Sequence, residues 1–262
     1  MSDWLHDLPL PWMAVVVLCF TYGLTAAIYA VVAALAVGER ARSFKLVSPG
    51  MLSPLGIIFG LFVAFTASQV WSDNERANAA VNREASALRS VVLFAASFPG
   101  DSETRLRALV QRYIEDAANK DWPAMARRAA DLHMTPQPLA DALQLVLALK
   151  PDNPGSVTAQ REIVAALETV VDARRQRILV SLSAVNSFKW ACLYLQALCA
   201  LLAIALVHSD NRLASALSMG VFATGVAVSV LLIAAYDRPF TGQLSVTPAP
   251  LLEVMPTGAQ SS

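Results

Sequence analysis

The chain has 262 residues, of which 56% are hydrophobic and 15% are charged, whereas soluble domains carry about 25% charged residues. Of the 20 basic and 20 acidic residues, twenty-nine lie between positions 73 and 189. The formal net charge of zero gives no electrostatic footprint for nucleic acid, and three cysteines in apolar segments exclude a disulfide framework. The composition indicates a membrane protein with a charged middle segment.

Four stretches without Asp, Glu, Lys or Arg are long enough to cross a bilayer, which takes about 20 apolar residues in a helix. We place the spans near residues 11–37, 51–71, 190–208 and 213–236. The first is too long for a signal peptide and lacks a basic segment before it, so we expect it to be retained. The predicted organisation is a transmembrane hairpin over 1–72, an extramembrane insert over 73–189, a second hairpin over 190–240 and a partly disordered tail over 241–262.

These spans predict a multi-pass integral protein, which we expect in the bacterial inner (plasma) membrane. Basic residues do not fix its orientation. The short connections contain Arg40, Arg42, Lys45 and Arg212, which favours cytoplasmic short loops. The basic residues at the two ends of the insert favour the opposite orientation, so the two counts conflict and sidedness stays open.

The insert is predicted to be helical throughout. Residues 72–98 contain no Gly or Pro and are rich in helix formers, so the second span is expected to continue as one helix over about 51–98, roughly 70 Å long. A turn at 151–155 precedes a helix that is expected to run into the third span without a break. The fold class is therefore an all-α membrane protein with four transmembrane helices and a helical domain inserted between helices 2 and 3.

No pattern predicts an enzyme. The histidines His6, His133 and His208 are far apart, and no metalloprotease, nucleophile-elbow, paired-cysteine or phosphate-loop motif is present. Cys192 and Cys199 are best explained as small residues that pack in a span. We expect no catalytic residue, no cofactor and no metal ligand.

The second span has two stripes that repeat every fourth residue. Small residues at Gly56, Gly60 and Ala64 form a ridge that permits close helix packing. The neighbouring stripe is polar at both ends and hydrophobic between them, which is typical of a pore-lining helix, because hydrophobic constrictions gate conduction by dewetting. Ordinary lipid-facing or bundle-packing surface is the alternative. The candidate pore-lining residues are Ser53, Ile57, Leu61, Phe65 and Gln69.

Several motifs together resemble a known family. The second span reads Pro54-x-Gly56-Ile57-x-x-Gly60-Leu61-Phe62-Val63, followed by Trp71. Further along the chain are Glu84-Ala85-x-x-Leu88, Asp121-Trp122-Pro123, Arg174-Arg175-x-Arg177 and Asp237-Arg238-Pro239-Phe240-x-Gly242. Over nearly its whole length the chain resembles the bestrophin-like family DUF4239, and more distantly the bestrophin anion channels.

The resemblance implies a homo-oligomer, pentameric in bestrophins, that passes inorganic anions through an axial pore lined by the second span. It places the hydrophobic neck at Ser53, Ile57 and Leu61. Bestrophin necks carry bulkier residues there, so the constriction is expected to be wider or to lie near Phe65. Bestrophins also follow Pro-Phe-Gly with an acidic run that binds calcium. This chain follows Phe240 with Thr-Gly-Gln-Leu-Ser-Val, which supplies no carboxylates, so no calcium clasp is expected.

Two interpretations remain open for the charged motifs. Glu84 and the arginines at 174–177 can form an ion pair between helices, or the arginines can form an electropositive ring that attracts anions. Asp237 and Arg238 are expected to anchor the end of the fourth span. For the whole protein, an oligomeric anion channel is the leading hypothesis, and a non-conducting membrane scaffold or sensor whose insert binds a partner is the alternative.

Overall fold

The computed structural model describes residues 8–36, 49–132 and 134–255, and within them it contains helices and no strand. The chain divides into two compact units. Unit 1 comprises Met1–Ser72, Ala184–Arg238 and Gly242–Leu244, and unit 2 comprises Asp73–Ser183, Pro239–Thr241 and Ser245–Ser262. The loop residues Arg40, Arg42 and Lys45, together with His133, lie outside the described residues.

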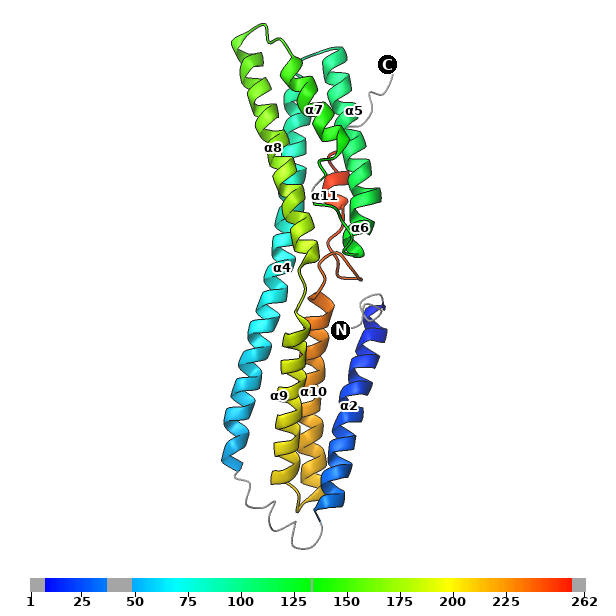
Figure 1. Ribbon diagram of the computed structural model, residues 1–262, viewed down its shortest axis with the longest axis vertical. Helices are drawn as coiled ribbons and strands as arrows, with labels where there is room; N and C mark the ends of the chain where they lie inside the picture. The colour runs from blue at the N-terminus through cyan, green and yellow to red at the C-terminus, as the bar shows by residue number, and fades with distance from the viewer. Residues whose placement is uncertain (1–7, 37–48, 133, 256–262) are drawn as a thin grey trace. The chain divides into compact units, whose positions relative to one another are not determined.

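Unit 1 contains the four helices that are long and apolar enough to cross a membrane. They are α2 (Leu10–Leu35), the first part of α4 (Leu52–Ala95), α9 (Ser187–Val207) and α10 (Arg212–Tyr236). Helices α2, α9 and α10 lie side by side (Figure 1). The expected all-α fold with four spans is confirmed.

Several hydroxyl side chains in the spans form hydrogen bonds within the chain. The hydroxyl groups of Thr21, Thr25 and Thr66 each donate to the backbone carbonyl four residues earlier. The Tyr22 hydroxyl on α2 and the Thr224 hydroxyl on α10 are 2.7 Å apart and hydrogen-bonded. An unpaired hydroxyl group in the hydrocarbon of a bilayer costs free energy, and these hydrogen bonds avoid that cost.

The long helix expected over 51–98 is present as α4, which runs from Leu52 to Ala95. The expected continuation of the insert into the third span is wrong. Helix α8 (Pro154–Leu182) ends at Ser183, which is extended, and α9 begins four residues later. The Ser183 hydroxyl donates to the Val180 carbonyl, and the Asn186 side chain caps α9 by accepting from the Phe188 amide. Such short side chains compete with helical hydrogen bonds, which explains the break.

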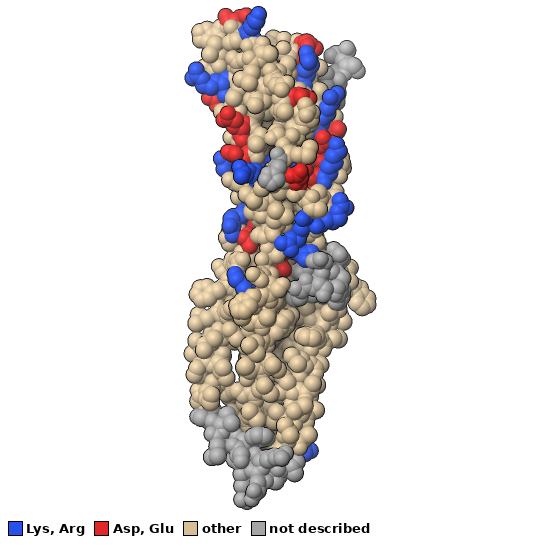
Figure 2. All heavy atoms as spheres, viewed as in Figure 1, with Lys and Arg blue, Asp and Glu red and all other residues tan. Residues whose placement is uncertain are grey.

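Unit 2 is a helical domain with its own apolar core. Its helices are the rest of α4, α5 (Asp101–Asp116), a π-helical turn η2 (Ala117–Asp121), α6 (Trp122–Ala126), α7 (Gln137–Ala148), α8 and α11 (Ala249–Leu252). Asn153 and Ser156 form a capping box at the start of α8. On the face shown in Figure 2, acidic and basic side chains gather on unit 2, and the spans are almost free of them.

The segment after the fourth span contributes to the core of unit 2. Phe240, Val246, Leu251 and Val254 are buried together with residues of the insert. The tail therefore has a defined structure through Met255. Residues 256–262, where the expectation of partial disorder also applies, lie outside the described residues.

Candidate pore face and buried ion network

The membrane part of α4 is the least covered of the four spans. Only 11% of its most apolar 18-residue window is buried inside the chain, against 28% for α2 and 33% for both α9 and α10. A span that is apolar and uncovered must face lipid, another copy of the chain or a pore. The helix with the predicted pore stripe thus has the surface that those roles require.

The stripe residues themselves lie on this uncovered surface. Ser53 and Ile57 are exposed, as are Leu61 (53%) and Phe65 (73%). Gln69 is half-buried and accepts a hydrogen bond from the Lys189 ammonium at the start of α9. The structure therefore fixes Gln69 within unit 1 and leaves the apolar members of the stripe without contacts that would define their role.

The small-residue ridge is also open. Gly56, Gly60 and Ala64 are exposed, and a Cβ added at either glycine would meet no described atom within 4 Å. In the part of the chain that the structure describes, no helix packs closely on this ridge. The close contact predicted for it is not made within the described chain, which leaves a second copy or lipid as its partner.

A second candidate site is a buried network of charged side chains in unit 2. Glu84 on α4 and Arg177 on α8 are both fully buried and form a two-pronged pair, with Nε–Oε2 at 2.8 Å and Nη2–Oε1 at 3.0 Å. Asp121 accepts from Arg177 Nη2 at 3.3 Å and from Arg174 at 2.9 and 3.1 Å. Tyr113 donates its hydroxyl to Glu84.

The network balances two carboxylates against two guanidinium groups. Burial by itself lowers the pKa of Arg177, but the charge of Glu84, the interactions with Tyr113 and Asp121 and the hydrogen bond to Glu84 together raise it more, so the net pKa is above its ordinary value. Burial, followed by the charge of Glu84, raises the pKa of Tyr113 well above 10. Arg177 also lies over the Trp122 ring, with its central carbon 4.3 Å from the ring centroid. Both groups are held in their protonated forms.

These contacts favour the ion-pair interpretation of the arginine motif for Arg174 and Arg177. Arg174 and Arg177 are buried in ion pairs, so an electropositive ring built from them is wrong, because neither guanidinium faces open solvent. The predicted pairing of this motif with Glu84 is present. Arg175, the third arginine of the motif, is exposed and lies outside the network. The sequence did not indicate that Asp121 would join it.

The motif at the end of the fourth span has contacts in both units. Asp237 is buried in unit 1 and accepts a hydrogen bond from the Val185 amide at 2.6 Å, which agrees with the expected anchoring role. In unit 2, Phe240 packs edge-on against Trp122 at 5.9 Å, and the Pro239 carbonyl accepts from the Val246 amide at 2.7 Å. Gly242 has φ of 87°, which favours glycine at this turn.

The neighbouring residues complete this arrangement. The Trp122 indole donates to the Val246 carbonyl at 3.0 Å, and Pro123 occupies the first turn of α6, where its missing amide hydrogen costs nothing. Arg238 is half-buried. Sequence reasoning found these motif residues separately, and the structure brings Trp122 and Phe240 into contact.

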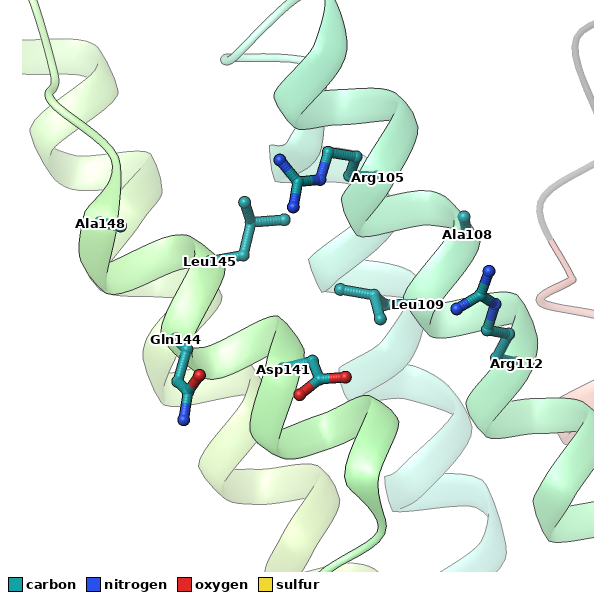
Figure 3. Close-up of a pocket in the computed structure, with 8 residues that line it drawn as sticks. All are labelled: Arg105, Ala108, Leu109, Arg112, Asp141, Gln144, Leu145 and Ala148. Atoms are coloured by element: carbon teal, nitrogen blue, oxygen red, sulfur yellow. The ribbon is translucent and has the colours of Figure 1, made fainter.

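A groove between α5 and α7 was not predicted. It has a volume of about 590 Å³. Figure 3 shows Arg105 and Arg112 on α5 and Asp141 on α7 pointing into it. Its apolar floor includes Leu109 and Leu145. Nothing in the local sequence pattern distinguishes these residues from ordinary amphipathic helix surface.

No described group of three or more His, Cys, Asp or Glu side chains could hold a metal ion. The segment directly after Phe240 offers Thr241, Gly242, Gln243 and Leu244, which include no carboxylate. Hard cations such as calcium need several oxygen ligands, usually carboxylates, and this segment supplies no carboxylate.

Comparison with known proteins agrees with the fold. A family model described as a bestrophin-like domain matches residues 19–251. A point mutant of a bacterial bestrophin homologue from Klebsiella pneumoniae has a TM-score of 0.72 at 15% identity, covering 91% of this chain and 97% of that one. Another structure of a homologue from the same organism has a TM-score of 0.64 at 14% identity, covering 90% and 95%. None of the curated proteins compared matches the chain.

Proposed function

The chain belongs to the bestrophin-like family, a family of channel-type membrane proteins, and on that premise we propose that it is an oligomeric anion channel whose pore is lined by α4. The observation that supports this proposal best is the uncovered surface of α4 in unit 1, of which only 11% is buried. A helix that lines a central pore must leave one face free of its own chain. The exposed Ile57, Leu61 and Phe65 then form the hydrophobic constriction.

The same proposal gives the small-residue ridge a role. In a ring of subunits, each α4 has one face toward the pore and a flank toward the neighbouring subunit. Gly56, Gly60 and Ala64 lie beside the pore stripe, and their small size permits close approach of a helix from a second copy. We propose five copies, as in bestrophins, in the bacterial inner membrane. Gating is independent of calcium, because the segment after Phe240 supplies no carboxylates.

The test is electrical and structural. Purified full-length protein in planar bilayers is expected to carry current, and with a chloride gradient the reversal potential should lie near that of chloride. Particle averages in detergent should show rotational symmetry with α4 innermost. A protein that carries no current at any pH, voltage or ion composition, and whose particles have no axial pore, would refute the proposal.

A non-conducting scaffold or sensor is the alternative function. The groove between α5 and α7 is the specific observation that favours this alternative. It offers a binding partner the guanidinium groups of Arg105 and Arg112 and an apolar floor. Replacing Arg105 and Arg112 by Gln should then abolish the cellular phenotype, whereas Leu61→Ala should not alter it. The channel proposal predicts the reverse pattern.

A further inference from the structure

The extramembrane part of α4 presents a second open face, in unit 2. One side of this segment is buried in the core of unit 2, with Leu88 and Val91 fully inaccessible. On the opposite side, exposed residues recur at spacings of three and four, which is one face of a helix. They are Glu75, Ala79, Asn82, Ser86 and Arg89, with Arg83 exposed on the flank.

Two cations on this face have no acidic partner on their own helix. Four other cations in unit 2, Arg76, Arg105, Arg107 and Lys120, each pair with an acid three or four residues away on the same helix. Arg83 and Arg89 have Ala, Ser, Val or Leu at every such position. Among the described residues neither forms an ion pair, so their charges are not neutralised locally.

The acidic residues of this part of α4 form no ion pair with Arg83 or Arg89. Asp73 pairs with Arg76, and Glu84 is buried against Arg177. Glu75, at the beginning of the segment, is the remaining carboxylate on α4. The open face thus carries two unneutralised guanidinium groups beside small polar side chains, Asn82 and Ser86, which suit contact with water.

We infer that this face lines an aqueous vestibule in which Arg83 and Arg89 of each subunit concentrate small inorganic anions. The inference rests on the proposed function. Because α4 is a single helix from Leu52 to Ala95, the helix that lines the proposed pore is also the one that carries these arginines. Repeated around a symmetry axis, they form rings of positive charge, which is how channels favour anions. Arg174 and Arg177 cannot supply such rings, because they are buried in ion pairs.

The test exploits electrostatic screening. Charges in a water-filled vestibule act over a Debye length of about 30 Å at 0.01 M salt but only about 3 Å at 1 M. The double variant Arg83→Gln with Arg89→Gln is therefore expected to lower single-channel chloride conductance about threefold at low salt. This change is well below the roughly 10- to 1000-fold increase in local ion concentration that focused fields can produce. At 1 M salt the conductance of variant and wild type should converge.

The matched control is Arg161→Gln, which removes an exposed cation from α8 in the same unit. It should leave conductance unchanged at both salt concentrations, and all variants should elute as the wild-type oligomer. If the double variant conducts like wild type at low salt while Leu61→Ala changes conductance, the vestibule is refuted and the channel stands. If wild type carries no current, the channel proposal fails. A particle structure with Arg83 and Arg89 pointing away from the symmetry axis overturns the vestibule in either case.

Discussion

The two halves of α4 differ in how much they contribute to the fold of a single chain. The extramembrane half has Glu84, Leu88 and Val91 fully buried, so it is part of the core of unit 2. The membrane half has Ile57, Leu61 and Phe65 each more than half exposed. One helix therefore has an end with a fully buried face and an end whose predicted pore stripe the chain itself leaves exposed. Substitutions at the buried residues of the extramembrane half should alter stability, and substitutions at the exposed residues of the membrane half should alter function with little effect on stability.

The largest expected effect on stability is that of Glu84→Gln. This variant leaves the buried Arg177 with only the carboxylate of Asp121, 3.3 Å away and shared with Arg174, as a negative partner, and breaking a buried pair on one side costs about 3–5 kcal/mol. Denaturant unfolding of the detergent-solubilised protein, followed by a probe in unit 2, measures the loss. Arg175→Ala is the control, because that guanidinium is exposed, and it should change the free energy of unfolding by less than about 0.5 kcal/mol. Equal losses in the two variants would contradict the role of the network.

The next largest effect comes from a matched pair of identical substitutions on α4. Leu88→Ala removes a fully buried side chain and should lower the free energy of unfolding by about 2–5 kcal/mol. Leu61→Ala removes a side chain that is 53% exposed and should cost well under 1 kcal/mol. The same unfolding assay measures both. Similar costs would mean that the Leu61 face of α4 is packed as closely as the Leu88 face.

A smaller effect is expected from pH. The pKa of Tyr113 is raised well above 10 in the folded protein, through burial and then Glu84, so the folded state keeps this proton to higher pH than the unfolded state does. The stabilisation is complete below pH 10 and is lost as pH rises through the folded pKa. Comparing the unfolding free energy of wild type and Tyr113→Phe between pH 8 and 11 isolates this contribution. The wild type should lose more stability than the variant over that range, and parallel curves would argue against the shift.

Substitutions in the proposed constriction should have the smallest effect on stability and a clear effect on conductance. Replacing Leu61 or Phe65 by Ala shortens the side chain and should widen the constriction. Single-channel conductance should then rise, because a wider hydrophobic neck is more readily wetted. Bilayer recordings measure this change. Val221→Ala on α10 is a suitable control, because that side chain is also exposed but lies on a different span. If it raises conductance as much as Leu61→Ala, α4 is not the pore helix.

Much of the fold was predictable because charge-free runs have few structural alternatives. The predicted spans at 190–208 and 213–236 differ by only a few residues from α9 and α10. The pairing of Glu84 with the arginine motif was also predictable, because a buried charge needs a partner. The break between α8 and α9 was missed, because Ser183 and Asn186 bind their own backbone in a way that composition does not reveal.

The open faces of α4 could be predicted only in part. The repeat of four in the second span indicated a special surface, but a stripe of Ile, Leu and Phe has the same pattern whether it is packed or bare. Exposure is a tertiary property that depends on where the other helices lie. The contact of Trp122 with Phe240 was equally out of reach, because it joins segments that are far apart in the chain.

The position of the C-terminal segment has a consequence for biosynthesis. Phe240, Leu251 and Val254 fill the core of unit 2, yet they are synthesised after all four spans. When the insert leaves the ribosome, these side chains are still missing, and the apolar surface that they cover is open. Unit 2 can therefore complete its folding only after the last span has been made, so synthesis of all four spans precedes final closure of the extramembrane domain.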